Sequence, residues 1–150
     1  MAPDEGTALK LRAEDAEDLA VISACLQDAL VAVRDVAYVP EERSFFFVAN
    51  RFRWENGLSP LPGETPLERT LCGVAFREVT AASYYGFRRD DDGRILSLLA
   101  IRTEGGSVRL EFSGGAAIRL DLVRILCHAS DLGEPWPTPW RPRHDLDAAP

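Results

Sequence analysis

Hydrophobic residues recur at two spacings along this chain, a helical one before residue 31 and a strand-like one after it. The first set consists of Leu19, Ile22, Leu26 and Leu30. Their spacing predicts an amphipathic helix that ends near Leu30. Acidic residues at 14–18 precede this set, where the helix dipole favours negative charge. Before the helix, residues 9–12 alternate between leucine and a basic residue, which predicts a short edge strand.

The densest aromatic stretch, residues 44–55, predicts the central strand. Alternate residues of a strand face opposite sides. One face carries Phe46, Val48, Asn50, Phe52 and Trp54, and the other carries Phe45, Phe47, Ala49, Arg51 and Arg53. We expect the apolar end to be covered on both sides, with the helix on the Phe45 face. The basic end of that face should emerge toward solvent or toward a ligand.

Period-two patterns and turn residues predict further strands on both sides of this one. They lie at 33–39, 69–80, 81–89, 95–102, 108–112 and 117–128. Residues 40–43 read as the turn of a hairpin between 33–39 and 44–54, and residues 56–66 as a loop. A helix is the alternative for 117–128, because its apolar residues also fit helical spacing.

These elements predict an α+β fold, mostly antiparallel β, in one domain that spans 1–150. Six to eight strands would form a bent sheet or small barrel, by analogy pleckstrin-homology-like, with the N-terminal helix packed on it. Residues 1–7 read as a frayed terminus. The proline-rich tail, 131–150, is expected to be pinned across the domain by Trp136 and Trp140. The alternatives are a docking motif in which these tryptophans bind a partner, and disorder.

The net charge of −7 argues against two kinds of binding partner. It argues against nucleic acid, which needs a basic face, and against anionic membranes. We expect no signal peptide, since the N-terminal residues are acidic and not hydrophobic, and the sequence has no apolar run that could span a bilayer. Three cysteines in apolar runs predict free thiols in a reducing cytoplasm. We expect no cofactor and no metal, since Asp90–Asp92 lack the spaced ligands of a calcium loop.

Arginines carry the candidate chemistry, because the sequence shows no nucleophile–base arrangement. Arg51 and Arg53 share a strand face, about 7 Å apart by strand rise. With Arg119 they could bind phosphate or carboxylate groups bidentately, beside a wall made by Trp54. In the competing interpretation these arginines pair with carboxylates on a solvated sheet face, where each pair contributes little. The acidic residues available for that pairing are Glu55, Glu78, Glu111 and Asp121.

Four segments together resemble a bacterial family catalogued as a domain of unknown function. They are 19–28, 50–55, 114–120 and the proline–tryptophan tail that ends at His144. The resemblance spans nearly the whole chain. It implies a small single-domain cytoplasmic protein, and it implies neither an activity nor a catalytic residue.

The sequence therefore favours a non-enzymatic binding or adaptor module that recognises a protein segment or an anionic small molecule. The alternative is a small enzyme acting on an anionic metabolite, with arginines positioning the substrate and His144 or a carboxylate as the acid–base group. A deep pocket that contains Arg51, Arg53 and His144 would favour the enzyme, whereas a bare strand edge would favour protein binding. A homodimer through an edge strand is compatible with the pattern.

Overall fold

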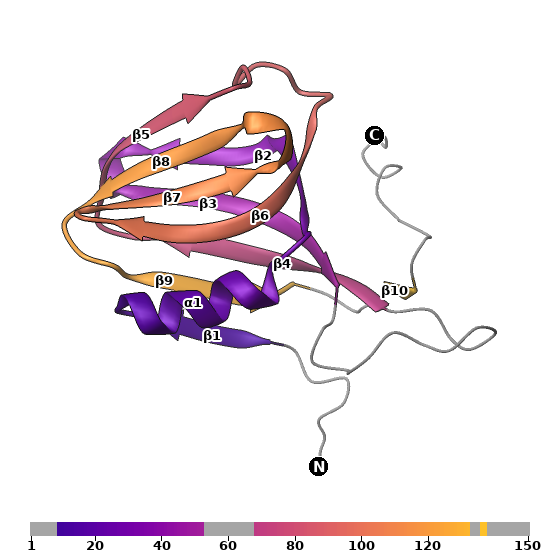
Figure 1. Ribbon diagram of the computed structural model, residues 1–150, viewed down its shortest axis with the longest axis horizontal. Coiled ribbons are helices and arrows are strands. Elements are labelled where there is room, and N and C mark those ends of the chain that lie inside the picture. The colour runs from indigo at the N-terminus through magenta and orange to yellow at the C-terminus, as the bar shows by residue number, and fades with distance from the viewer. Residues whose placement is uncertain (1–8, 53–67, 133–135, 138–150) are drawn as a thin grey trace, which may run out of the picture.

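The structure is a computed structural model that describes residues 9–52, 68–132 and 136–137 (Figure 1). Within these residues it contains one α-helix, α1 Ala16–Cys25, and two 3-10 turns, η1 Pro40–Glu42 and η3 Ser113–Gly115. The strands are β1 Lys10–Ala13, β2 Leu30–Val39, β3 Ser44–Phe52, β4 Glu68–Phe76, β5 Val79–Tyr85, β6 Ile95–Glu104, β7 Ser107–Phe112, β8 Ala117–Leu122, β9 Cys127–Asp131 and β10 Trp136–Pro137. The predicted fold, a mostly antiparallel β structure with one N-terminal helix, is confirmed.

All described strands belong to one antiparallel sheet with the order β1-β9-β4-β3-β2-β6-β7-β8-β5, and β10 pairs with β4. The sheet folds over on itself, so that β6, β7, β8 and β5 face the layer that contains β2, β3 and β4 (Figure 1). Ten described strands exceed the six to eight predicted. The excess comes from β9 and β10, because the sequence pattern merged β9 with β8 and left β10 in the tail.

The single strand predicted for 117–128 is wrong, and so is its helical alternative. β8 pairs with β5 and β7, whereas β9 pairs with β4 and β1. Between them the chain crosses from one layer to the other, beside the corner where β4 turns into β5. Two backbone bonds join these corners, from Val123 N to Glu78 O at 3.0 Å and from Arg77 N to Leu126 O at 2.8 Å. Glu78 itself has a φ of 59°, so the strand boundary predicted at 80/81 lies at 77–78 instead.

The helix begins at Ala16, among the acidic residues that predict its start, and it ends earlier than the predicted end near Leu30. The Asp15 side chain caps it by accepting from Asp18 N at 2.8 Å. It ends at Cys25, and Leu30 already belongs to β2. α1 packs mainly against β6 and β1. Its buried residues Leu19 and Ile22 join the same core as the β3 side chains.

The core lies between the two layers, and one of the two predicted faces of β3 points into it while the other points away from it. Phe45, Phe47 and Ala49 are buried, whereas Phe46 and Phe52 on the other face are half-buried. The apolar end is therefore fully covered on the Phe45 side and only partly covered on the other, where cover was also expected. Arginine guanidinium groups stack on the outer rings, Arg77 on Phe46 at 5.1 Å and Arg69 on Phe52 at 4.0 Å. Cation–π contacts of this kind let an aromatic ring remain at the surface.

Candidate functional site

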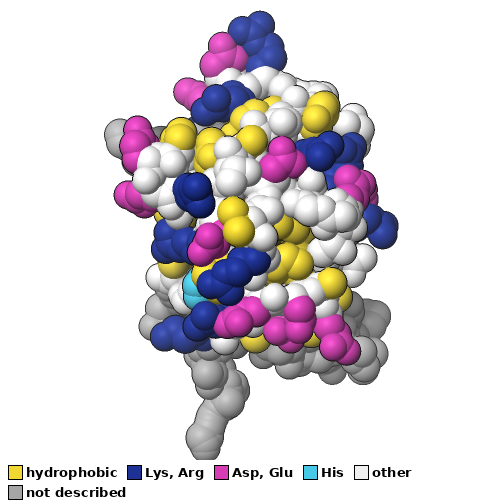
Figure 2. All heavy atoms as spheres, turned by 90° about the vertical axis from the view of Figure 1, so that its left-hand side faces the viewer, with side chains coloured by type: hydrophobic (Ala, Val, Ile, Leu, Met, Phe, Trp, Pro, Cys, Tyr) yellow, Lys and Arg dark blue, Asp and Glu magenta, His cyan; other side chains and the backbone are white. Residues whose placement is uncertain are grey.

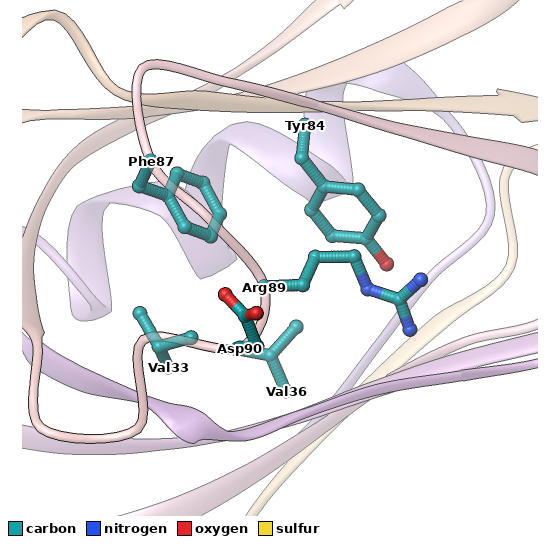
Figure 3. A pocket seen from close by; sticks show the side chains of 6 residues that line it. All are labelled: Val33, Val36, Tyr84, Phe87, Arg89 and Asp90. Atoms are coloured by element: carbon teal, nitrogen blue, oxygen red, sulfur yellow. The ribbon is translucent and has the colours of Figure 1, made fainter.

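A pocket of about 350 Å³ opens where the curled sheet fails to close on itself (Figure 3). It lies between β2, the end of β5 and the loop that leads to β6. The lining residues are Val33, Val36, Tyr84, Phe87, Arg89 and Asp90. This volume is within the range of small-molecule sites, which are often found at the mouths of β-barrels.

An irregularity in β2 creates the opening. β2 pairs with β6 over three residues, Leu30 to Ala32, and the pairing ends where Ala32 lies opposite Ile95. Its pairing with β3 breaks between Val31 and Val36, so the intervening residues bulge away from the ladder. Beyond the bulge β2 approaches β5, which lies at the end of the strand order, but the described strands do not pair there. The opening between β2 and β5 is therefore a seam in the sheet.

Two hydrogen bonds from β2 limit the pocket, and one of them spans the seam. The Tyr38 hydroxyl donates to Val79 O at 3.0 Å, which joins β2 to the first residue of β5. Val33 N donates to Arg94 O at 2.9 Å, which joins β2 to the loop before β6. These bonds fix β2 relative to the start of β5 and to the loop before β6. The space between the two bonds is available to a ligand.

The inner wall of the pocket is apolar and aromatic. The rings of Tyr84 and Phe87 meet edge to face with centroids 5.9 Å apart. Val33 is almost fully buried, and Val36 packs against the core from the same strand. Burial raises the pKa of Tyr84, and the nearby Arg89 charge opposes that shift. The phenol is therefore neutral at physiological pH and able to donate a hydrogen bond.

The rim of the pocket carries two opposite charges on consecutive residues. The guanidinium of Arg89 lies 4.9 Å from the centre of the Tyr84 ring. Among the described residues no carboxylate lies within ion-pair distance of Arg89. Asp90 accepts from Arg88 Nε at 3.1 Å and Nη2 at 3.0 Å, and this bond lowers the pKa of Asp90. Both charges of the rim are therefore present at neutral pH.

Arg51 lies elsewhere, in the interior. Its side chain is 0% exposed and pairs with Asp131 on β9. The expectation that the basic end of β3 emerges toward solvent is therefore wrong at Arg51. The ligand-binding role predicted for this residue stays a prediction, and the described contacts favour a structural role.

Arg119 lies on the outer face of β8, directly opposite Arg109 of β7 in the strand register. It donates to Asp121 at 3.0 Å and to the Ser107 hydroxyl at 3.1 Å. In the same way, Glu111 on β7 accepts a hydrogen bond from Arg102 on β6 at 2.8 Å. These contacts match the competing interpretation of a solvated, ion-paired sheet face. Figure 2 shows basic and acidic side chains interspersed in this manner on one face of the molecule.

The structure does not bring the described site candidates together, since Arg51 faces the core and Arg119 faces outward on a strand that does not pair with β3. Arg53, Trp54, Trp140 and His144 lie outside the described residues. The backbone of Trp136 pairs with Arg69 on β4, while its side chain is not described. Docking of the tail and partner binding by its tryptophans therefore stay predictions.

Sequence reasoning missed the residues that line the pocket. The available signal was the run from Tyr84 to Asp90, in which aromatic residues are followed by two arginines at a turn. By its pattern this run predicts the end of a strand followed by a turn, which gives Arg89 and Asp90 no role in binding a ligand. Nothing in the local pattern shows that Val33 and Val36 of β2 would lie opposite it.

The comparison with protein families agrees with the sequence resemblance. The family model described as "Protein of unknown function (DUF2948)" matches residues 9–144. No curated protein and no solved structure matches significantly. Within the described residues no helix is long and apolar enough to cross a membrane.

Proposed function

Since the chain belongs to the DUF2948 family of proteins of unknown function, we propose a function from the pocket itself. The protein is a non-enzymatic binding module in a reducing cytoplasm. The seam between β2 and β5 holds a small molecule with an apolar body and a carboxylate. This keeps the class of ligand expected from the sequence, an anion held by arginine, and moves it from Arg51 and Arg119 to Arg89.

The position of Arg89 is the observation that supports this proposal. Its guanidinium stands at the rim of an apolar pocket and has no carboxylate partner among the described residues. Arg89 is exposed, as are Arg119 and Arg124, but each of those two faces a carboxylate, at 3.0 Å and 3.8 Å. A guanidinium beside a partly desolvated cavity binds a carboxylate bidentately and more strongly than one in open water.

The chemistry of the lining residues favours binding over catalysis. Tyr84 carries the one hydroxyl among them, and its raised pKa makes it a poor nucleophile. The carboxylate of Asp90 could act as a base, but it is bound to Arg88 and its pKa is lowered. A general base works best with a pKa near the working pH. The enzymatic alternative would need a group from outside the described residues, such as His144.

Thermal unfolding with and without 3-phenylpropionate tests the proposal. A ligand at a hundred times its dissociation constant adds about 2.7 kcal/mol to the free energy of unfolding. In a domain of this size the melting temperature should rise by roughly 5–10 °C. The uncharged 3-phenylpropanamide should produce a much smaller rise, because it lacks the charge that Arg89 recognises.

The Arg89→Gln variant should lose the shift, whereas Arg124→Gln should retain it. Arg124 is an exposed arginine in the connection between β8 and β9; it pairs with Glu78 and does not line the pocket. An equal shift in the Arg89→Gln variant, or no shift with 3-phenylpropionate in the unmodified protein, would contradict the proposal.

A further inference from the structure

We infer that the ligand is zwitterionic, a free α-amino acid with an apolar side chain whose carboxylate binds Arg89 and whose ammonium group binds Asp90. This inference rests on the proposed function and names the class of ligand for the same pocket. It follows from the charges that line the rim, from the hydrogen-bonding capacity of Asp90 and from the apolar wall beneath them.

Arg89 and Asp90 are consecutive residues, and the side chains of both line the pocket (Figure 3). A simple carboxylate can bind Arg89, but the neighbouring charge of Asp90 would weaken that binding, and the charge of Arg89 would likewise weaken the binding of a simple amine to Asp90. An α-amino acid carries both charges on groups separated by one carbon atom. It therefore meets an attractive partner for each charge at the same time.

Asp90 can accept from an ammonium group without losing Arg88. An ionised carboxylate offers about four acceptor positions, of which the two bonds from Arg88 use one on each oxygen. The Arg88–Asp90 pair is also highly exposed, with side-chain exposures of 81% and 71%. An exposed pair contributes little stability, so a small reorientation toward a ligand costs little.

The wall beneath the rim selects the side chain of the amino acid. Val33, Val36 and the edge-to-face pair of Tyr84 and Phe87 offer apolar contacts and no charge. A branched aliphatic or aromatic side chain would bury its surface there, whereas a charged one would lose its hydration without a partner. The neutral Tyr84 hydroxyl can donate to the bound carboxylate beside Arg89.

Titration calorimetry of the full chain with three related probes tests the inference. The probes are L-phenylalanine, 3-phenylpropionate, which lacks the ammonium group, and phenethylamine, which lacks the carboxylate. L-Phenylalanine should bind at least tenfold more tightly than either of the others. Asp90→Asn should weaken L-phenylalanine about tenfold and should not weaken 3-phenylpropionate. Asp91→Asn is the matched control, because Asp91 is exposed in the same turn and does not line the pocket.

The possible failures are distinguishable. If 3-phenylpropionate binds as tightly as L-phenylalanine and Asp90→Asn changes neither, the zwitterion is overturned and the carboxylate pocket of the proposed function stands. If none of the probes binds, or if only phenethylamine binds, both the zwitterion and the carboxylate pocket are overturned. If Asp91→Asn weakens L-phenylalanine as much as Asp90→Asn, the assigned ammonium site is overturned.

Discussion

Arg51 on β3 and Asp131 on β9 form a bidentate ion pair across β4, with Nε–Oδ1 and Nη2–Oδ2 distances of 2.9 Å and 2.8 Å. Their side chains are 0% and 3% exposed. Arg51 Nη1 also donates to Phe52 O, and Asp131 Oδ2 accepts from Leu9 N at 2.8 Å. Asp131 N in turn donates to Leu9 O at 2.9 Å. One buried pair thus links β3, β9 and the residue that precedes β1.

Removal of one partner from this pair should destabilise the protein strongly. Arg51→Met leaves the Asp131 carboxylate buried without its counter-charge, which typically costs about 3–5 kcal/mol. Urea unfolding should show this loss. The double variant Arg51→Met/Asp131→Leu should recover much of it, because apolar side chains of similar volume can replace a buried pair.

The exposed pair of Arg119 and Asp121 provides the control. Their side chains are 46% and 43% exposed. Arg119→Met should therefore cost no more than about 1 kcal/mol. An equal cost for Arg51→Met and Arg119→Met would show that the buried pair does not hold the strands together.

Strand periodicity placed Arg51 on the correct face but not in the correct environment. The alternation of β3 puts Arg51 with Phe45 and Phe47, and that face is the core. An arginine at the end of a strand is normally exposed. Its burial depends on Asp131, which is 80 positions away in sequence and was assigned to the tail. Local patterns carry no information on such a distant partner.

The same limit explains the errors at the corners of the sheet and the missed pocket. Hydrophobic alternation predicts the hairpin of β2 and β3 and the successive strands β6 and β7, because each pairing forms between neighbours in sequence. The alternation continues without a break across the crossing between β8 and β9, because apolar residues continue there, and it therefore predicts one strand in place of two. The pocket requires β2 to approach β5, and that contact follows from the curl of the whole sheet.

Gly86 should be the most sensitive glycine of the turn that carries the pocket residues. Its φ is +79°, and an added Cβ would lie 2.8 Å from Gly115 O and 2.9 Å from Ala116 Cα. Gly86→Ala should therefore add a backbone clash to the cost of left-handed backbone, which is about 1–2 kcal/mol. Urea unfolding should show a loss above that range. The variant should also weaken ligand binding, because Phe87 and Arg89 follow in the same turn.

Gly114 offers the matched comparison. Its φ is +77°, and nothing lies within 4 Å of an added Cβ. Gly114→Ala therefore measures the backbone cost alone, and the difference between the two variants measures the clash. If both variants lose the same stability, the close approach of Gly86 to Ala116 has no energetic role.

The two buried thiols should make the protein less stable at alkaline pH. Burial raises the pKa of Cys72 and of Cys127 from 9.0 to about 12. Between these values the unfolded thiols lose their protons while the folded ones keep them, so the folded state binds more protons. The stabilising effect of each thiol is complete below pH 9 and declines as the pH rises toward 12. Urea unfolding should therefore show lower stability at pH 10.5 than at pH 8.

A variant without these thiols separates their effect from other alkaline titrations. In Cys72→Ala/Cys127→Ala the stability should be lower at pH 8, because buried volume is lost, but it should fall less between pH 8 and pH 10.5. An unchanged pH dependence in this variant would contradict the assignment to the thiols. Cys25 is only half-buried and is left in place in both proteins.

Ser23 should be the side chain that holds α1 against the sheet. Its hydroxyl accepts from Ile101 N at 2.9 Å, close to the point where the register of β6 and β7 shifts between Leu98 and Ala100. Ile101 is 5% exposed, so Ser23→Ala would remove the acceptor of a buried N–H, at a cost of about 1–3 kcal/mol. Hydrogen exchange should then show a large loss of protection at the Ile101 amide.

Thr80→Ala is the control for Ser23→Ala, because the Thr80 hydroxyl also bonds to backbone, donating to Asp121 O at 3.2 Å, but at the surface. Water can replace that bond, so the variant should change stability by no more than about 0.5 kcal/mol. If Ser23→Ala behaves in the same manner and the Ile101 amide stays protected, the helix is held by its apolar contacts alone. A selective loss of protection at the Ile101 amide would show instead that the Ser23 hydroxyl replaces a backbone hydrogen bond that is lost near the register shift of β6.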